Sequence, residues 1–320
     1  MKMLRTLSFA LVIFPLLFSC QKTTESSEET VEQEAKVVIP KAKYSLAQWS
    51  FNRDLLGGEM NTVDFVKAAG EMGFEGVEYV NQFFLDKVDN FEYLDSLNEA
   101  ASAAGIKNLM IQVDNIGNLS ASDTEEREKA IEEGKKWVDA AKYLGCPAMR
   151  INAHGDGTPE EMKENSIAGI GALADYANEK GVQIIIENHG GVSNDGAWLA
   201  DLVASLSDKN VGSLADFHNW CIEREGGALW GAPCIKEYDY YKGFAELIPT
   251  AKGISVKAFE FDAEGNETTM DFGKFFQIMK DAEYDGYLGI EYEGKSLPSK
   301  DGILKTKALA AKSWAAVYSK

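Results

Sequence analysis

Short apolar runs alternate with segments of helical periodicity along most of the chain. Eight of these runs predict β-strands, and their cores, such as the IIIE of residues 184–187, carry apolar residues without strict alternation. Uniformly apolar strands are typical of a parallel sheet that is buried on both faces. The predicted strands are 44–48, 76–79, 108–112, 148–152, 183–187, 211–216, 253–257 and 288–291.

A helix is predicted after each strand. Several of these helices stop at a glycine just before the next strand, as at Gly105, Gly145 and Gly181. The predicted helices are 62–72, 91–104, 123–144, 160–180, 197–206, 241–247, 272–281 and 304–318. Eight strand–helix units predict an α/β fold, a (β/α)8 TIM barrel in a single domain. A doubly wound open sheet is the alternative, but the expected glycine-rich GxGxxG turn is absent after the first strand.

The first forty residues differ in composition from the rest. Residues 1–19 combine Lys2 and Arg5 with a short apolar stretch, which predicts a lipoprotein signal peptide ending before a lipidated Cys20. An ordinary signal peptide with a chance cysteine is the alternative. Residues 20–40 are mostly polar and predict a disordered tether, and the barrel is expected over 41–320. The protein is therefore expected to be exported and lipid-anchored, in the periplasm or at the outer membrane or cell surface, and to touch the membrane through its lipid alone.

The charge of the chain argues against nucleic acid as a partner, and the cysteine positions allow one disulfide. The formal net charge is −19 and no basic run is present, which argues against nucleic acid as a partner. Of the cysteines after Cys20, Cys221 and Cys234 lie in one predicted loop, 219–237, and could form a disulfide in an oxidising compartment. Cys146 is expected to be a buried free thiol. The loop itself could act as a lid.

Three acidic residues stand where predicted strands end: Glu187, Asp216 and Glu291. In a parallel α/β barrel these positions face one site, and three converging carboxylates need protons or a cation to offset their repulsion. Ordinary loop carboxylates are the simpler interpretation. Carboxylate oxygens suit Mg²⁺ or Mn²⁺, and the nearby histidines extend the choice to Co²⁺ or Zn²⁺.

Other polar and aromatic side chains are expected around the same site. All three histidines of the chain lie at predicted strand ends, which favours a functional role for them jointly. The residues expected to bind substrate are Glu78, Gln112, Arg150, Asn152, His154, His189, Lys257 and Trp49. Trp49 could stack on a sugar ring, although loop packing is the simpler explanation of any single tryptophan.

Four segments carry a resemblance to a known family: ENHGG, ADFHNW, SVKAFEFDAEGNE and GYLGIEYEG, at the ends of predicted strands five to eight. They resemble the xylose isomerase-like TIM barrel superfamily, whose members are often called sugar phosphate isomerases/epimerases. The resemblance extends from about residue 43 to the C-terminus. It implies one divalent metal ion and a site at the carboxyl ends of the strands.

The ketose epimerase branch of that superfamily holds its metal with Glu, Asp, His and Glu on strands five to eight. Glu187, Asp216 and Glu291 match three of these, and the resemblance implies that Glu187 and Glu291 are also the acid/base pair. Ser255 stands where the histidine is usual. Three explanations stay open: His218 or His189 compensates as a ligand, the ion is weakly held, or metal catalysis is lost. Lys257 matches a lysine of the same segment, where it could contact substrate or pair with a carboxylate.

The expected function is therefore a metal-dependent isomerase or epimerase of a non-phosphorylated or keto sugar, acting by proton abstraction alpha to a carbonyl. Two alternatives remain. A keto-glycoside lyase or hydrolase would use the same site, and a non-catalytic glycan-binding lipoprotein would retain it without turnover. The oligomeric state is not predicted.

Overall fold

Eight parallel strands close into a barrel in the computed structural model, which describes residues 39–319. Their order around the barrel is β1-β10-β9-β6-β5-β4-β3-β2, and β1 pairs with β10 to close it. The barrel strands are β1 (Lys43–Ala47), β2 (Gly76–Val80), β3 (Lys107–Gln112), β4 (Ala148–Ile151), β5 (Gln183–Glu187), β6 (Gly212–Asp216), β9 (Ala251–Ala258) and β10 (Tyr287–Tyr292). The predicted (β/α)8 TIM barrel in one domain is confirmed.

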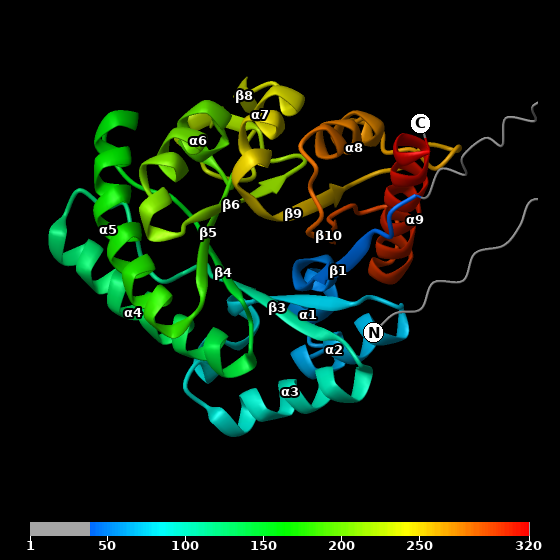
Figure 1. The fold of residues 1–320 in the computed structure, drawn as a ribbon, viewed down its shortest axis with the longest axis horizontal. Coiled ribbons are helices and arrows are strands. Elements are labelled where there is room, and N and C mark those ends of the chain that lie inside the picture. Colours follow the sequence, from blue (N-terminus) through cyan, green and yellow to red (C-terminus); the bar gives the residue numbers. More distant parts are fainter. Residues whose placement is uncertain (1–38, 320) are drawn as a thin grey trace, which may run out of the picture. The chain divides into compact units, whose positions relative to one another are not determined.

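Helices cover the outside of the barrel, one after each strand (Figure 1). They are α2 (Thr62–Glu71), α3 (Phe91–Ala104), α4 (Thr124–Leu144), α5 (Pro159–Lys180), α6 (Gly196–Ser205), α7 (Tyr240–Leu247), α8 (Phe272–Asp281) and α9 (Ser299–Tyr318), with a short α1 (Asn52–Leu56) after β1. The prediction that glycines end three of these helices is confirmed. Gly105, Gly145 and Gly181 are the C-caps of α3, α4 and α5 and adopt the left-handed conformation, with φ of 67°, 73° and 73°.

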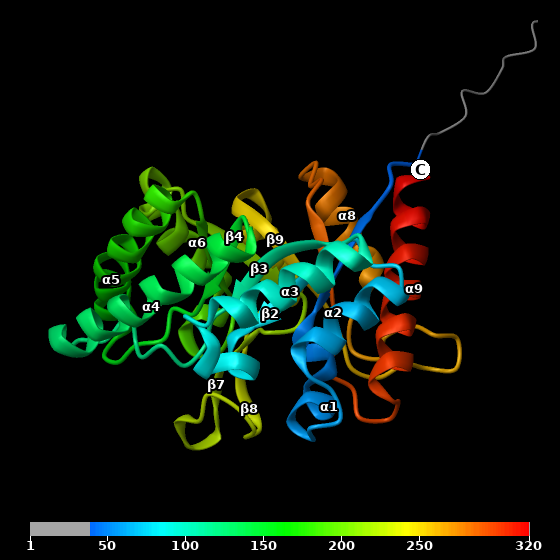
Figure 2. The same ribbon diagram turned by 90° about the horizontal axis from the view of Figure 1, so that it is seen from below.

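Two elements differ from the sequence-based expectation. Helix α9 begins at Ser299, five residues before the predicted start of 304, because Pro298 fixes its N-cap and polar residues form its first turn. The predicted loop 219–237 contains an antiparallel hairpin of β7 (Cys221–Arg224) and β8 (Cys234–Glu237). In Figure 2 this hairpin projects from the same end of the barrel as α1.

Two hydrophobic clusters stabilise the barrel. The larger lies between the strands and the helices, where apolar side chains such as Phe65, Ile186 and Phe275 are fully buried. The smaller consists of Met110, Ala148, Ile185 and Leu214, one from each of four neighbouring strands. Because side chains on one face of a strand recur every second residue, the next inward position on each strand comes two residues later.

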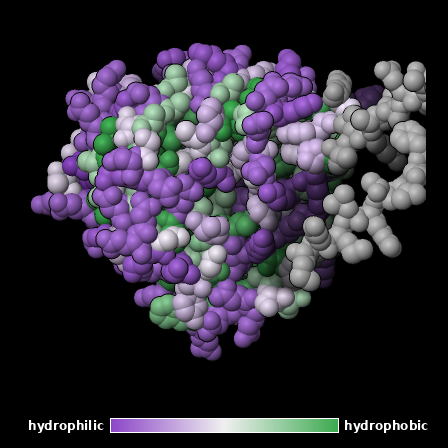
Figure 3. All heavy atoms as spheres, viewed as in Figure 1, coloured by the Kyte–Doolittle hydropathy of each residue, from purple (hydrophilic) through white to green (hydrophobic). Residues whose placement is uncertain are grey.

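Outside these clusters the surface is polar. The face drawn in Figure 3 is mostly hydrophilic, with hydrophobic residues in separate small groups. Within residues 39–319, no helix has the length and apolar character needed to cross a membrane. The predicted signal peptide 1–19, Cys20 and nearly all of the predicted tether 20–40 lie outside the described residues.

Candidate active site

The floor of the site lies directly above the smaller hydrophobic cluster. Two residues beyond Met110, Ala148, Ile185 and Leu214 come Gln112, Arg150, Glu187 and Asp216, which are buried polar side chains at the carboxyl ends of their strands. Because side chains on one face of a strand recur every second residue, an apolar layer is followed directly by a polar layer toward the carboxyl ends of the strands. Strands β9 and β10 add Lys257 and Glu291, which are paired in register.

Glu187, Asp216 and Glu291 form one cluster. Each is buried, and each offers a carboxylate oxygen, the three oxygens lying within 4.8 Å of one another. At such distances the carboxylates repel strongly unless positive charge lies between them. His218 is not a member of this cluster, although the sequence suggested it as a ligand.

Two cations accompany the carboxylate cluster. Lys257 Nζ lies 3.4 Å from Asp216 Oδ2, 3.4 Å from Glu291 Oε2 and 2.6 Å from Glu293 Oε1. Arg150 Nε lies 2.8 Å from Glu187 Oε2, an ion-pair distance at which the N–H is not aligned for a hydrogen bond. Burial lowers the pKa of Lys257, but the attraction of Asp216, Glu291 and Glu293 outweighs it and holds that pKa well above its usual value.

The Glu187 carboxyl has a raised pKa. Burial raises its pKa to about 8, with Asp216 and Glu291 adding to the rise and Arg150 and Lys257 opposing it. Asn219 donates to Glu187 Oε1 at 3.3 Å, and Oε2 has no hydrogen-bond partner. A buried carboxyl with such a pKa can accept a proton near neutral pH and release it again.

The cluster fits a divalent cation. Asp216 Oδ1 accepts from the backbone N–H groups of His218 and Asn219 at 2.7 and 2.8 Å, while Asp216 Oδ2 is buried without a hydrogen-bond partner. Asp216 Oδ2 and Glu187 Oε2 face Lys257 and Arg150 but accept no hydrogen bond, and carboxylate oxygens are the hard donors that Mg²⁺ and Mn²⁺ prefer. Ser255 donates its hydroxyl to Glu291 Oε2 at 2.6 Å, so it positions a carboxylate and does not replace a histidine ligand.

A second charged group lies beside the cluster, centred on Asp114. Its Oδ1 accepts from Arg150 at 2.7 Å and from Asn152 at 2.6 Å, and Arg150 also donates to Gln112 at 3.0 Å. Burial raises the pKa of Asp114, but Arg150 and His189 outweigh it and hold that pKa well below its usual value. Asp114 was not among the predicted binding residues. Its place two positions after Gln112, on the same side of the chain, was the available signal.

The three histidines lie apart from the carboxylate cluster. His154 Nε2 is 2.6 Å from the carbonyl oxygen of His189, and the two rings stack with centroids 6.2 Å apart. His218 packs against Phe259 and Tyr240, at 4.4 and 5.7 Å between centroids. Burial lowers the pKa of all three histidines, so they are neutral at physiological pH.

A cavity of about 690 Å³ opens above the floor. Of the predicted site residues that the structure describes, Glu78 and Asp216 are not among its lining side chains. Glu78 lies deeper, where it accepts from Ser45 at 2.5 Å and from Gln112 at 3.3 Å. The predicted residues that do line the cavity are Trp49, Gln112, Arg150, Asn152, His154, Glu187, His189, His218, Lys257 and Glu291.

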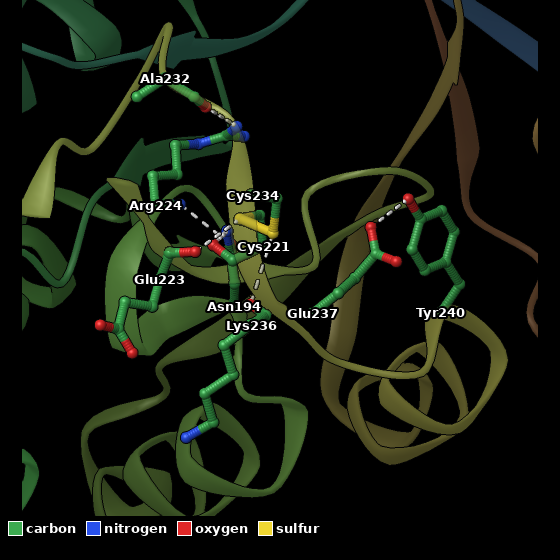
Figure 4. Close-up of a disulfide and its surroundings, with 10 residues drawn as sticks. Asn194, Cys221, Glu223, Arg224, Ala232, Cys234, Lys236, Glu237 and Tyr240 are labelled. Atoms are coloured by element: carbon green, nitrogen blue, oxygen red, sulfur yellow. Dashed lines mark hydrogen bonds between the residues drawn. A yellow bond between two sulfur atoms is a disulfide. The ribbon is translucent and has the colours of Figure 1, made fainter. Parts of the chain in front are cut away.

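Residues of the β7–β8 hairpin line part of this cavity. A disulfide joins Cys221 to Cys234, as the sequence allowed, and Cys146 is buried and free, as expected. Arg224 donates to the carbonyl of Ala232 at 2.8 Å, and Asn194 donates to the carbonyl of Cys221 at 2.8 Å (Figure 4). The hairpin brings Arg224, Leu229 and Trp230 to the cavity, and Arg224 and Leu229 were not predicted from the sequence.

Comparison with known proteins gives one family and several similar folds. The family model described as Xylose isomerase-like TIM barrel matches residues 66–313. A search of curated proteins finds no match.

Among solved structures, the chain is similar to the 3-keto-D-glucoside 4-epimerase YcjR from E. coli, at 14% identity and a TM-score of 0.63, covering 85% of this chain and 100% of that one. It is also similar to a D-allulose 3-epimerase from Methylomonas sp., at 17% identity and a TM-score of 0.63, covering 86% and 99% of the two chains. A third similar structure is the IolI protein with a bound zinc atom, at 15% identity and a TM-score of 0.66, covering 86% and 99%. At these identities the likeness concerns the fold.

Proposed function

Because the chain belongs to the xylose isomerase-like TIM barrel family, we propose that it is a metal-dependent isomerase or epimerase of a sugar. The observation that carries this proposal is the cluster of Glu187, Asp216 and Glu291, with three carboxylate oxygens within 4.8 Å of one another under a cavity. The names of the similar structures, which include two sugar epimerases, support the same reaction class.

One divalent ion, Mn²⁺, Mg²⁺, Co²⁺ or Zn²⁺, would be held by Glu187, Asp216 and Glu291. Bound there, such an ion polarises a carbonyl and its neighbouring hydroxyl, which makes the adjacent carbon-bound proton more acidic. His218 stays outside this ligand set, because its ring packs between Phe259 and Tyr240. The structure of IolI contains zinc, which supports a metal at this fold's site.

Glu187 and Glu291 are proposed to move the proton. They come from β5 and β10, so they approach a sugar above the floor from different sides of the barrel. One carboxylate removes the proton from the carbon next to the carbonyl, and the other returns it. Return to the opposite face of the same carbon gives epimerisation, whereas return to the neighbouring carbon gives aldose–ketose isomerisation.

The remaining polar groups are proposed to orient the hydroxyls of the sugar. Gln112, Arg150, Asn152 and Lys257 supply donors at the floor, and His189 Nδ1 is buried without a hydrogen-bond partner. Fixing the reacting carbon close to a carboxylate accounts for much of the rate that such sites achieve.

The charges of the cavity favour a non-phosphorylated or keto sugar. Four lining side chains are acidic and three are basic: Asp114, Glu187, Glu291 and Glu293 against Arg150, Arg224 and Lys257. Arg150 and Lys257 already face carboxylates at 2.6 to 2.8 Å. A phosphate group would therefore have to compete with Asp114, Glu187 and Glu293 for these two cations, which opposes its binding.

The test is metal content and product mass. We expect close to one divalent ion per chain after purification in Mn²⁺ without chelator, and its loss in Glu187→Gln. The matched control is Glu223→Gln, an exposed hairpin residue outside the cavity, which should keep the ion. Conversion of a ketose or keto-glycoside to a product of the same mass supports the proposal.

Two other results would change the assignment. Two fragments in place of one isomer would favour the keto-glycoside lyase. Sugar binding without turnover or metal, in both the parent and Glu187→Gln, would favour a glycan-binding protein.

We also propose that the protein is exported and anchored through lipidated Cys20, in the periplasm or at the outer membrane or cell surface. Support comes from the signal-like sequence of residues 1–19. The Cys221–Cys234 disulfide adds support, because such bonds persist in oxidising compartments.

A further inference from the structure

The cavity is divided into a charged floor and an apolar roof. The floor is formed by the carboxylates and cations described above, whereas the roof is formed by Trp49, Phe259, Leu229 and Trp230. Trp49 and Phe259 come from barrel loops, and Leu229 and Trp230 come from the tip of the β7–β8 hairpin. A sugar occupying the floor therefore leaves the apolar surfaces above it uncovered.

Trp230 holds a defined position over the mouth of the cavity. Its ring lies 4.5 Å from that of His189, between centroids. Gly190, with φ of 95°, lies against the same ring, and a Cβ there would come within 2.9 Å of two of its atoms. The indole is therefore seated on the Gly190 backbone and the His189 ring, although 45% of the residue is exposed.

The hairpin that carries this roof is fastened to the barrel. The Cys221–Cys234 disulfide closes its base, Glu225 donates to the carbonyl of Pro233 at 3.0 Å, and Asn194 holds Cys221 from the loop after β5. Leu229 and Trp230 are exposed apolar residues on a hairpin that is cross-linked and hydrogen-bonded to the barrel. Exposed apolar side chains on a rigid element are typical of a binding surface.

The size of the cavity exceeds that of one sugar. Even if each of the roughly twelve non-hydrogen atoms of a hexose took the ~30 Å³ of a water molecule in the liquid, the hexose would occupy about 360 Å³. The cavity measures about 690 Å³, so a comparable volume remains beneath the roof. That remaining volume has aromatic and aliphatic walls, which favour a ring with an apolar face.

We propose that the substrate is a keto-glycoside with two rings: a keto-sugar ring on the charged floor and an apolar-faced second ring against Trp230 and Leu229. The inference rests on the proposed function for the placement of the sugar. It adds the substrate class and assigns Trp230 as a residue that determines specificity.

The experiment compares the binding of methyl and phenyl glycosides by calorimetry, in the gluco, galacto and manno series, to the metal-loaded protein. We expect the phenyl glycoside of at least one series to bind at least tenfold tighter than its methyl counterpart. Trp230→Ala should remove most of that preference, measured as the ratio of phenyl to methyl glycoside affinity. Ile235→Ala is the matched control, because Ile235 is an exposed apolar residue of the same hairpin outside the cavity, and it should keep the preference.

Equal binding of the methyl and phenyl glycosides in all three series, including no binding of either, would overturn the inference. A preference that survives Trp230→Ala would also overturn it. The proposed function is judged separately, by turnover and metal content. A phenyl preference without any turnover therefore supports the two-ring site while contradicting the enzyme, and turnover of free ketoses without a phenyl preference does the reverse.

Discussion

At the scale of single residues, the interior of the barrel places buried carboxyls next to one another at two depths. Glu187, Asp216 and Glu291 form the upper group, and Lys257 and Arg150 offset their charge. Glu78 lies below them and has only the neutral donors Ser45 and Gln112 as hydrogen-bond partners. The two depths therefore differ in how ionisation is compensated.

The protonation of Glu78 gives a pH-dependent prediction. Burial raises its pKa from 4.5 to about 7, with Glu291 adding to the rise and Ser45, Gln112 and Arg150 opposing it. Between pH 4.5 and about pH 7, Glu78 keeps its proton in the folded protein and loses it in the unfolded chain. The free energy of unfolding therefore falls as the pH rises through this range. Glu78→Gln stays neutral, so its stability relative to the parent should increase by on the order of 3 kcal/mol between pH 4 and pH 8.

Urea unfolding at the two pH values measures this difference. The matched control is Glu71→Gln, an exposed position at the end of α2, whose difference from the parent should be nearly the same at both. A Glu78→Gln difference that does not change with pH would contradict the assigned pKa.

Sequence reasoning placed the three clustered carboxylates at strand ends but did not predict which cations pair with the neighbouring residues. The strand-end positions of Glu187, Asp216 and Glu291 follow from the apolar run before each residue. The Asp114–Arg150 pair joins residues 36 positions apart, and their meeting depends on the register of two neighbouring strands. His218 lies outside the group of three clustered carboxylates, and its ring packs near Phe259 and Tyr240, both distant in sequence, so its role as a ligand stays a prediction.

At the scale of elements, the barrel strands were predictable and the hairpin was not. Buried parallel strands such as β5, found at the predicted residues 183–187, carry continuous apolar runs. Strand β8 is exposed at all four of its residues, so no apolar pattern marks it. The disulfide and the hydrogen bonds to the barrel stabilise this hairpin. Neither kind of interaction produces an alternating hydrophobic pattern from which the strands could be predicted.

The hairpin therefore depends on its cross-link. The double variant Cys221→Ser with Cys234→Ser removes a bridge with a sequence separation of 13 residues. Closing a loop of ~15 residues contributes about 3 kcal/mol, so the amides of residues 222–236 should exchange roughly a hundredfold faster, as measured by hydrogen exchange. Exchange in β5 and β6 is the internal control and should not change, because both strands are buried in the barrel. Unchanged exchange in the hairpin would show that its hydrogen bonds suffice.

At the scale of the whole molecule, the proposed lipid anchor at Cys20 gives a prediction about how the full chain partitions between detergent and water. We expect the full chain, made in a lipoprotein-processing bacterium, to enter the detergent phase of a Triton X-114 separation, and Cys20→Ser to stay in the aqueous phase. Cys146→Ala, which changes a buried thiol, should behave like the parent. Parent protein in the aqueous phase would rule out the anchor.

Strand β10 both completes the barrel and carries one of the clustered carboxylates. It pairs with β1 and so closes the barrel, and it carries Glu291, one of the three clustered carboxylates. Until that strand has been synthesised and docked, the chain has neither a closed sheet nor the complete carboxylate cluster. A chain that stops before residue 287 therefore lacks the closing strand and the third clustered carboxylate together.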